Sequence, residues 1–439
     1  MCPDSGYPNA DGSTVVSEEV GTEECSEETA EVKSPLLRAL LHVKWASLLQ
    51  KAGKYDRAEE HYANSLSLMP SARAHFGRGT CLAALRRRLE AMAELEKAKE
   101  LCPKMVGAII NLAGVQLGLS LFAEAEQNCR EALRLEPDSR EAVMNLANAL
   151  RNLGRRTEAV QLVWQHIAVA TGDEVEKTEI DCSKWEAPTN KDAEVVVVCL
   201  KWGKRYNADY VNRLCASARR RMPKHISASF VCFTEDPDGI DDYVETRTLP
   251  EGFPLWWGKA YLFSEDAGLD GQRVLFLDLD QVIVGPLDAL VAYQGPLALL
   301  HTDTIACELA SGGYNSSVIS WYGSKFLRPL FEKLTPAVLR YVHRFDHWLE
   351  MMVLHADLWQ KVAPGQILDY TTTFRAGRCL GCDESSDDMA GAFAAGEAEA
   401  ASPMSVELPS CALVTFPRSP KPHEVLEEHK WIQEHWSVV

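Results

Sequence analysis

The sequence predicts an α-helical repeat region followed by an α/β domain. Three observations predict this fold class: alanine and proline recur at a fixed interval in the first half, a polar stretch follows, and short β-branched runs then alternate with helical patterns. A chain of 439 residues is expected to form two or three domains. We place a disordered acidic segment at 1–34, helical repeats at 35–172, a linker at 173–192, and an α/β domain at 193–439 with a disordered insertion at 381–408.

The repeats are visible as a period of 33 or 34 residues. Alanine recurs at Ala58, Ala91, Ala125 and Ala159, and proline recurs at Pro70, Pro103 and Pro137. Small residues at fixed places let two antiparallel helices approach closely, and a proline marks where a helix must stop. The pattern resembles the tetratricopeptide repeat over roughly residues 37–170, a class that commonly binds peptides. Arg86, Arg87 and Arg88 replace the expected turn of the second unit. We interpret them as a solvated basic edge, with a binding surface as the alternative.

Charge and composition exclude some classes of protein. The net charge of −18 arises from residues 1–32, with nine acidic side chains, and residues 381–408, with seven; neither segment has a basic one. The remainder is nearly neutral, which argues against a nucleic-acid partner. We expect no signal peptide, because the first stretch is polar, and no membrane span, because the longest apolar run, Val195–Leu200, is too short.

Cysteine usage bears on the compartment. The thirteen cysteines have no framework spacing, which suits a reducing compartment and leads us to expect a cytoplasmic protein. Cys379 and Cys382 are a weak metal or redox signal, because no second pair accompanies them.

The second half has the pattern of a mostly parallel sheet wrapped by helices. The runs 194–200, 227–234 and 273–280 read as strands, and Tyr210–Arg219 has helical spacing. The third run ends in Asp278 and Asp280, whose i and i+2 spacing places both carboxylates on one side of an extended strand. At the carboxyl end of such a strand, hard oxygen ligands suit Mg²⁺ or Mn²⁺ bridging a diphosphate. The alternative is a polar strand end bonded to a nearby turn.

Four segments in order carry a second resemblance. They are Leu249–Phe263 with its double tryptophan, the Asp-Leu-Asp strand, Gly312–Trp321, and Phe416–His423, followed by the closing His435-Trp436. Together they resemble a nucleotide-sugar glycosyltransferase of the GT-A fold, nearest to bacterial and algal relatives of glycosyltransferase family 8. The resemblance covers residues 193–439 apart from the insertion.

This resemblance implies roles for particular residues. Asp278 would face the ribose and the metal, Asp280 would bind the metal, and Lys259 and Lys421 would approach the donor phosphates. Asn315 and Ser316 would line the donor sugar, with Asn315 and Asp346 as the catalytic candidates. The implied cofactor is Mn²⁺ or Mg²⁺, and the implied donor is a nucleoside-diphosphate sugar, with a UDP-sugar expected. Trp256 and Trp257 are interpreted as packing residues, with stacking on a ligand as the alternative.

The sequence departs from that family at the third metal ligand. The family has a histidine six residues before the lysine of its Lys-Pro pair, and this chain has Thr415 at that position. In related sequences the histidine lies two places later, where this chain has Pro417. We expect His423 to serve instead. An additional water on the metal or weakened activity are the alternatives.

The combined prediction is a metal-dependent glycosyltransferase with an unknown acceptor, whose repeats recruit a protein partner or the acceptor. One alternative is a catalytically weakened scaffold protein. Another is a phosphatase of the haloacid-dehalogenase type with Asp278 as nucleophile. That class needs the aspartate on the first strand of its core, whereas at least two strands precede Asp278.

Overall fold

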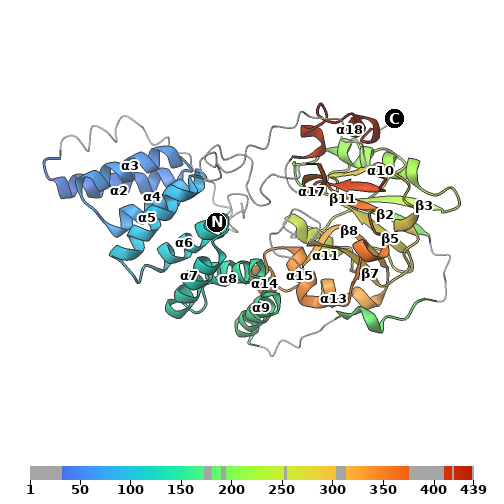
Figure 1. The fold of residues 1–439 in the computed structure, drawn as a ribbon, viewed down its shortest axis with the longest axis horizontal. Coiled ribbons are helices and arrows are strands. Elements are labelled where there is room, and N and C mark those ends of the chain that lie inside the picture. The colour runs from blue at the N-terminus through green and yellow to red at the C-terminus, as the bar shows by residue number, and fades with distance from the viewer. Residues whose placement is uncertain are drawn as a thin grey trace, which may run out of the picture. The chain divides into compact units, whose positions relative to one another are not determined.

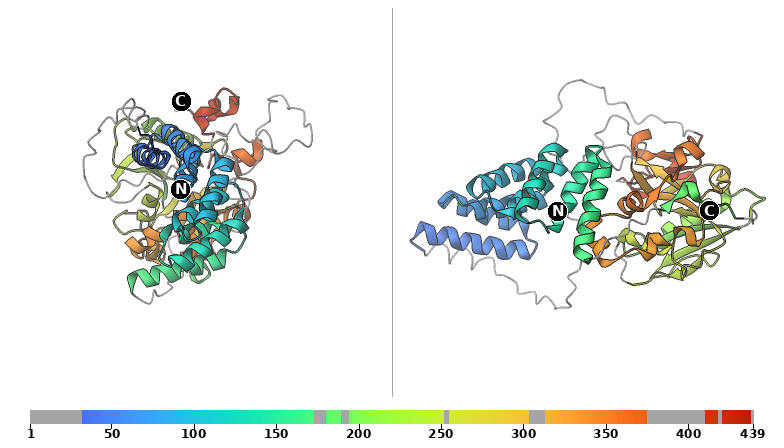
Figure 2. Two further views of the ribbon diagram at one scale, coloured as in Figure 1. Left: turned by 90° about the vertical axis from the view of Figure 1, so that its left-hand side faces the viewer. Right: turned by 90° about the horizontal axis from the view of Figure 1, so that it is seen from below.

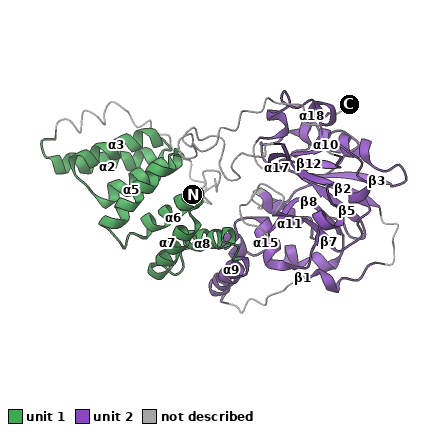
Figure 3. Cartoon of the chain, viewed as in Figure 1, with its two compact units in different colours: residues 1–155, 385–393 green, residues 156–384, 394–439 purple. Residues whose placement is uncertain are grey.

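The computed structural model describes residues 32–172, 180–188, 194–251, 255–302, 313–374, 410–417 and 420–437. The chain divides into two compact units, and the division falls between Arg155 and Arg156 (Figure 3). The predicted acidic segment, the insertion at 381–408 and the Cys379/Cys382 pair lie wholly or almost wholly outside the described residues. No helix in the described part of the chain is long and apolar enough to cross a membrane.

The first unit is a row of antiparallel helices, as the repeat period predicted (Figure 1, Figure 2). They are α2 (Pro35–Lys51), α3 (Tyr55–Leu68), α4 (Ala72–Ala84), α5 (Arg88–Leu101), α6 (Val106–Gly118), α7 (Phe122–Leu135) and α8 (Arg140–Asn152). Each helix contacts the next, and α2, α4, α6 and α8 also contact one another in order. These four helices therefore form one continuous face of the repeat unit.

Small residues lie where the helices pack closely against one another or begin. Ala58, Ala91 and Ala125 are fully buried between helices, so the space at each admits only a small side chain. A Cβ added at Gly77 of α4 would lie 2.2 Å from the ring of Tyr62 of α3, which shows how closely these two helices pack. Ser71 caps α4 by accepting a hydrogen bond from the Ala74 N–H at 3.2 Å.

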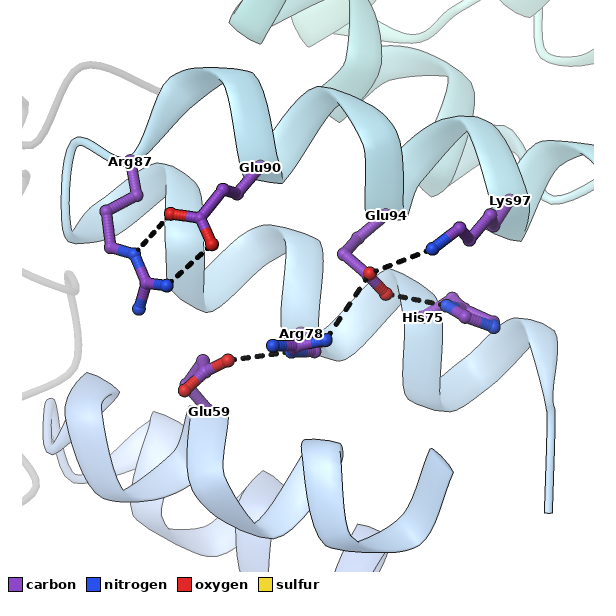
Figure 4. Close-up of polar contacts among 7 residues, drawn as sticks. All are labelled: Glu59, His75, Arg78, Arg87, Glu90, Glu94 and Lys97. Carbon is purple, nitrogen blue, oxygen red and sulfur yellow. Dashed lines mark hydrogen bonds and ion pairs between the residues drawn. The ribbon is translucent and has the colours of Figure 1, made fainter. Parts of the chain in front are cut away.

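The second repeat differs from the others by a buried charge network (Figure 4). His75 and Arg78 of α4 lie at the repeat positions that Ile109 and Leu112 occupy one period later. Both contact Glu94 of α5, His75 at 2.6 Å and Arg78 at 3.4 Å. The network continues from Arg78 to Glu59 of α3 at 2.7 Å and from Glu94 to Lys97 at 3.3 Å. Polar contacts thus replace part of the apolar packing in this repeat.

The three arginines that interrupt the repeat turn have separate roles. Arg86 adopts a positive φ of 62° and closes the turn between α4 and α5. Arg87 forms a two-pronged contact with Glu90 at 2.7 and 2.6 Å (Figure 4). Because Glu90 is exposed, this pair contributes little to stability.

The second unit is built on a mixed seven-stranded sheet with the strand order β10-β7-β8-β5-β2-β3-β4. Its strands are β2 (Val195–Lys201), β3 (Ala228–Thr234), β4 (Glu245–Thr248), β5 (Arg273–Leu277), β7 (Leu297–His301), β8 (Tyr314–Tyr322) and β10 (Asp357–Leu358). The neighbours β4, β3, β2 and β5 are parallel, as expected, while β8 runs antiparallel to both β5 and β7. The Val195–Leu200 run is buried throughout, which explains its unbroken apolar character.

Smaller elements complete this unit. The strands β11 (Ile367–Asp369), β12 (Leu413–Thr415) and β6 (Gln281–Ile283) form a three-stranded sheet. The helices are α10 (Ala208–Arg221), α11 (Gly258–Tyr261), α12 (Asp288–Val291), α13 (Pro329–Glu332), α14 (Pro336–Tyr341), α15 (Phe345–Met352), α16 (Trp359–Val362), α17 (Tyr370–Phe374) and α18 (Lys430–His435). The buried side chains of β2, β5 and β8 form the centre of its core.

The helix α9 (Arg156–Thr171), which the sequence places in the repeats, packs within the second compact unit. Its Trp164 packs against Trp348 of α15 with ring centroids 5.8 Å apart, and its Arg156 pairs with the buried Glu350 at 2.8 Å. The predicted linker also contains structure, because β1 (Ile180–Asp181) pairs with β9 (Val353–Leu354). The compact unit that holds the predicted site therefore begins before residue 172.

Candidate functional site

The predicted site lies at the end of β5, in the middle of the seven-stranded sheet. The strand stops at Leu277, earlier than the sequence indicated, and Asp278 to Asp280 form the connection to β6. The backbone N–H of Asp278 donates to the carbonyl oxygen of Ser317 at 3.0 Å, which fixes this connection to β8. The two carboxylates leave the strand at its carboxyl end, where open α/β sheets bind ligands.

Asp278 is held by Lys259 of α11. The lysine Nζ lies 2.8 Å from Oδ1 of Asp278, and it also donates to the carbonyl oxygen of Ser316 at 3.0 Å. The pKa of Asp278 is raised to about 6: burial is the largest cause, the charge of Lys259 opposes it, and the charges of Asp280 and Asp346 add to it. The lysine is therefore the counter-ion that favours the charged form of this carboxyl group.

Asp280 is held by a second lysine. Nζ of Lys421 lies 2.7 Å from Oδ2 of Asp280 and donates to the carbonyl oxygen of Phe416 at 2.6 Å. The hydroxyl of Tyr206 donates to the same carboxylate at 3.1 Å. Burial, followed by the charge of Asp280, raises the pKa of Tyr206 well above its ordinary value, so this phenol is a donor at neutral pH.

Three further candidates lie on β8 and α15. The Ser316 backbone N–H donates to Oδ1 of Asp346 at 2.9 Å. Because Lys259 donates to the carbonyl oxygen of the same serine, Asp346 and Lys259 are connected through Ser316. Asn315 is buried beside them and its Oδ1 accepts from the Ser317 N–H at 2.9 Å. Asp346 thus fixes the backbone of β8 in this structure, a structural role that the sequence did not indicate. Trp257 is fully buried, in agreement with the packing interpretation.

His423 does not join the carboxylates. Its Nδ1 is hydrogen-bonded to the hydroxyl of Tyr210 of α10, whose ring also meets the histidine edge-on. Thr415 is fully buried in β12, where it pairs in register with Gln281. Among the described residues, Asp278, Asp280 and His423 do not form a group that could hold a metal ion, and His423 is hydrogen-bonded to Tyr210.

The two carboxylates are suitable ligands for a divalent cation, but the arrangement of the residues around them is not. Two neighbouring carboxylates are the hard oxygen ligands that Mg²⁺ or Mn²⁺ prefers. Across the residues that the structure describes, however, no group of three or more His, Cys, Asp or Glu side chains could hold a metal ion. Each carboxylate has a lysine as its partner instead. A cation would fit this donor set only after the ammonium groups had moved from it.

Sequence reasoning missed Tyr206 and Tyr210. Their rings lie 4.7 Å apart, and Tyr206 contacts Asp280 directly. The available signal was the pair of aromatic residues four positions apart, immediately after the first buried strand.

Comparison with known proteins identifies the repeats. A Tetratricopeptide repeat family model matches residues 43–106 and 111–166, which confirms this class for the N-terminal region. Sperm-associated antigen 1 of Rattus norvegicus is 32% identical over 111 residues, covering 25% of this chain and 12% of that protein. Hsp70-Hsp90 organizing protein of Triticum aestivum is 29% identical over 99 residues, covering 22% of this chain and 17% of that protein. The chain therefore spans less than a fifth of the length of these relatives.

Solved structures match part of the chain at low similarity. The crystal structure of MamA matches with 18% identity and a TM-score of 0.30, covering 30% of this chain and 79% of that one. The first tetratricopeptide domain of Spaghetti (RPAP3) bound to an HSP90 peptide matches with 22% identity and a TM-score of 0.27. The match covers 27% of this chain and 95% of that one. The matched family model ends at residue 166, within α9.

Proposed function

We propose that this protein is an interaction scaffold whose repeats bind an acidic peptide segment of a partner protein. The observation that carries the proposal is the charge of the repeat unit. Residues 35–155 hold eighteen basic and thirteen acidic side chains, in a chain whose net charge is −18. A positive surface attracts acidic segments and speeds their association. The relationship of the repeats to Hsp70-Hsp90 organizing protein, named for bringing two proteins together, supports the same class of function.

The helices α2, α4 and α6 carry side chains with the chemistry for such a peptide. Lys44 of α2 and Arg73 of α4 are exposed, and neither forms an ion pair with a described carboxylate. In addition, Asn111 of α6 donates to the Thr80 hydroxyl of α4 at 3.0 Å, and the ring of Phe76 in α4 is half-buried. Cationic ends, amide and hydroxyl groups, and an aromatic surface together suit an extended acidic peptide.

The test is fluorescence anisotropy with a labelled glutamate-rich peptide and a neutral peptide of equal length. The double variant Lys44→Ala/Arg73→Ala should bind the acidic peptide about tenfold more weakly at low salt. Lys104→Ala is the matched control, because this exposed lysine lies between α5 and α6 with no ion pair to a described residue. Equal binding of the two peptides, or of the double variant and the wild type, would refute the proposal.

A second candidate function is sugar transfer from a nucleoside diphosphate at the end of β5. It is favoured by two ion pairs at this strand end, in which Lys259 of α11 contacts Asp278 and Lys421 contacts Asp280. Ammonium groups at the site can stabilise the negative charge that develops on a departing diphosphate. A divalent cation held by the two aspartates would add further electrostatic stabilisation of that group. In this proposal Asn315 and Ser316 contact the donor sugar.

The phosphatase alternative has less support. The strands β2, β3 and β4 all precede β5 in the same sheet, whereas that class carries its nucleophile on the first strand.

Transfer is tested by incubating the full chain with a panel of UDP- and GDP-sugars and Mn²⁺, with released nucleotide as the readout. The wild type should release nucleotide from one donor, and Asp280→Asn should abolish the release. Release that is equal in wild type and variant, or no release from any donor, would remove this second function and leave the scaffold proposal intact.

A further inference from the structure

A pocket of mostly charged and polar side chains is formed by α10, α18 and the strand β6 of the second unit. Its volume is about 380 Å³, and it is lined by Ser217, Arg220, Arg221, Ile283, Glu434 and His435. Small-molecule sites in proteins commonly have volumes of about 300–1,000 Å³. None of the residues that line this pocket has a role in either function proposed above.

We propose that this pocket binds the phosphate group of a small phosphorylated molecule, with Arg220, Arg221 and His435 as the hydrogen-bond donors. A guanidinium group suits phosphate because its N–H groups form a planar fork that matches two oxygens. The volume of the pocket leaves room for the organic part of the ligand. The inference does not depend on either function proposed above.

The first argument is the excess of positive charge at this end of α10. Four cationic side chains follow one another within six positions: Arg219, Arg220, Arg221 and Lys224. None of the four forms an ion pair with a carboxylate in the part of the chain that the structure describes. The acidic side chain that lines the pocket, Glu434, pairs with Lys430 at 3.3 Å. An anion that enters the pocket therefore meets positive charge that is not compensated.

The second argument is that the donors are held in place. Nη2 of Arg220 donates to the hydroxyl of Ser217 at 3.1 Å and to the carbonyl oxygen of Ser437 at 2.8 Å. Nη2 of Arg221 donates to Nδ1 of His435 at 3.1 Å. The buried Ser217 hydroxyl in turn donates to the carbonyl oxygen of His435 at 2.8 Å, which joins α10 to α18. Because a guanidinium group has five N–H donors, each anchored arginine keeps donors for a phosphate.

The third argument is the protonation of His435. A guanidinium group cannot accept a hydrogen bond, so Nδ1 of His435 accepts from Arg221 and the ring proton lies on Nε2. Burial, followed by the charge of Arg221, lowers the pKa of His435, which agrees with a neutral ring. The Nε2–H group of His435 is then a third donor for a phosphate oxygen.

A structural role at the helix end does not account for these arginines. Basic side chains often bind the free carbonyl groups at the C-terminus of a helix. Here the carbonyl oxygen of Arg221 already accepts from the Leu287 N–H at 3.0 Å. The Nη2 groups of Arg220 and Arg221 contact Ser437 and His435, which belong to the last segment of the chain and not to α10.

The experiment is isothermal titration calorimetry of the full chain with inorganic phosphate, glycerol 3-phosphate and glycerol. The variants Arg220→Gln and Arg221→Gln each remove one cation from the pocket. Arg219→Gln is the matched control, because this exposed neighbour lies over the ring of Tyr243 at 4.9 Å and does not line the pocket. Circular dichroism identifies any variant that fails to fold, and the other pocket variant then decides the test.

Wild type should bind glycerol 3-phosphate more tightly than inorganic phosphate, and glycerol should not bind. Each pocket variant should bind both phosphates about tenfold more weakly, because a charge-assisted hydrogen bond is lost, and Arg219→Gln should match wild type. Phosphate bound at another place, such as Lys259 and Lys421, would be unaffected by the pocket variants, and that result would overturn the proposal. An equal loss in Arg219→Gln would overturn it too, because general charge attraction then explains the binding.

Vesicles that contain phosphatidic acid test a lipid source of the same phosphate chemistry. Sedimentation should leave the chain in solution. Vesicle binding that depends on Arg220 and Arg221, together with no binding of glycerol 3-phosphate, would refute a small soluble ligand.

Discussion

Replacement of Glu94 by glutamine tests the charge network of the second repeat. Glu94 is 8% exposed and receives contacts from His75, Arg78 and Lys97. Glutamine has nearly the same shape, so the change removes the charge and little else. Its amide still offers one oxygen to a donor but presents an N–H₂ group where a second oxygen accepted.

The magnitude follows from these contacts. A hydrogen bond to a charged group contributes about 1.5–3 kcal/mol net. The contact at 2.6 Å to His75 is buried, the contact to Arg78 is longer at 3.4 Å, and Lys97 is 53% exposed and contributes little. Arg78 also keeps Glu59 at 2.7 Å as a partner. We therefore expect a loss of about 2 kcal/mol in the free energy of opening of this repeat.

The effect should depend on pH in one direction. Burial opposes ionisation of Glu94, but the hydrogen bonds from His75 and Lys97 and the charge of Arg78 outweigh it, so its pKa is lowered. A carboxyl group with a lowered pKa stabilises the fold above its unfolded pKa, about 4.3, and that contribution is lost as the pH falls through the folded value. The difference between wild type and Glu94→Gln should therefore be constant from pH 7 to pH 5.5 and shrink in more acidic solution.

Hydrogen exchange of the full chain, read by mass spectrometry, localises the effect. Peptides from α4 and α5 should exchange about thirtyfold faster at pH 7 in the variant, since each 1.4 kcal/mol is a factor of ten. Glu96→Gln is the matched control, because Glu96 is an exposed residue of the same helix with no ion pair to a described residue. Exchange in Glu94→Gln within threefold of wild type, or an equal effect of the control, would refute the reasoning.

Three other predictions concern the second unit. Trp164→Ala should destabilise it by about 3 kcal/mol, because a buried indole in contact with Trp348 is lost; faster exchange in α14 and α15 would show this, and unchanged exchange there would contradict the grouping of α9 with this unit. Mn²⁺ binding in the presence of UDP should strengthen as the pH rises through about 6, because the proton on Asp278 competes with the cation; calorimetry at pH 5 and pH 7.5 checks this, and equal affinities would contradict it. Gly323→Ala should abolish stable folding, since its Cβ would lie 1.8 Å from the backbone oxygen of Leu269; soluble protein with a wild-type melting curve would count against the packing described, and Gly107→Ala, which meets only the end of the Phe76 ring at 3.3 Å, is the milder comparison.

The polar network of the second repeat was within reach of sequence reasoning but was not found. Aligning the second and third units at Ala91 and Ala125 places His75 and Arg78 at the positions of Ile109 and Leu112. A charged side chain in an apolar seat predicts a buried partner of opposite charge, because an uncompensated buried charge is too costly. The run of three arginines in the turn is the more conspicuous feature of this repeat, because the network depends on only two exchanged positions.

By itself, the sequence determined the helical repeats, the strands β2, β3 and β5, and the place of Asp278 and Asp280 at a strand end. These features depend on periodicity, burial pattern and turn residues within a few dozen positions. Only the tertiary structure decided that α9 packs with the α/β unit, that Tyr210 holds His423, and that Lys421 reaches Asp280 from 141 positions away. The physical reason is that ion pairs and buried contacts depend on which distant side chains the fold brings within a few ångströms, and no local pattern encodes that.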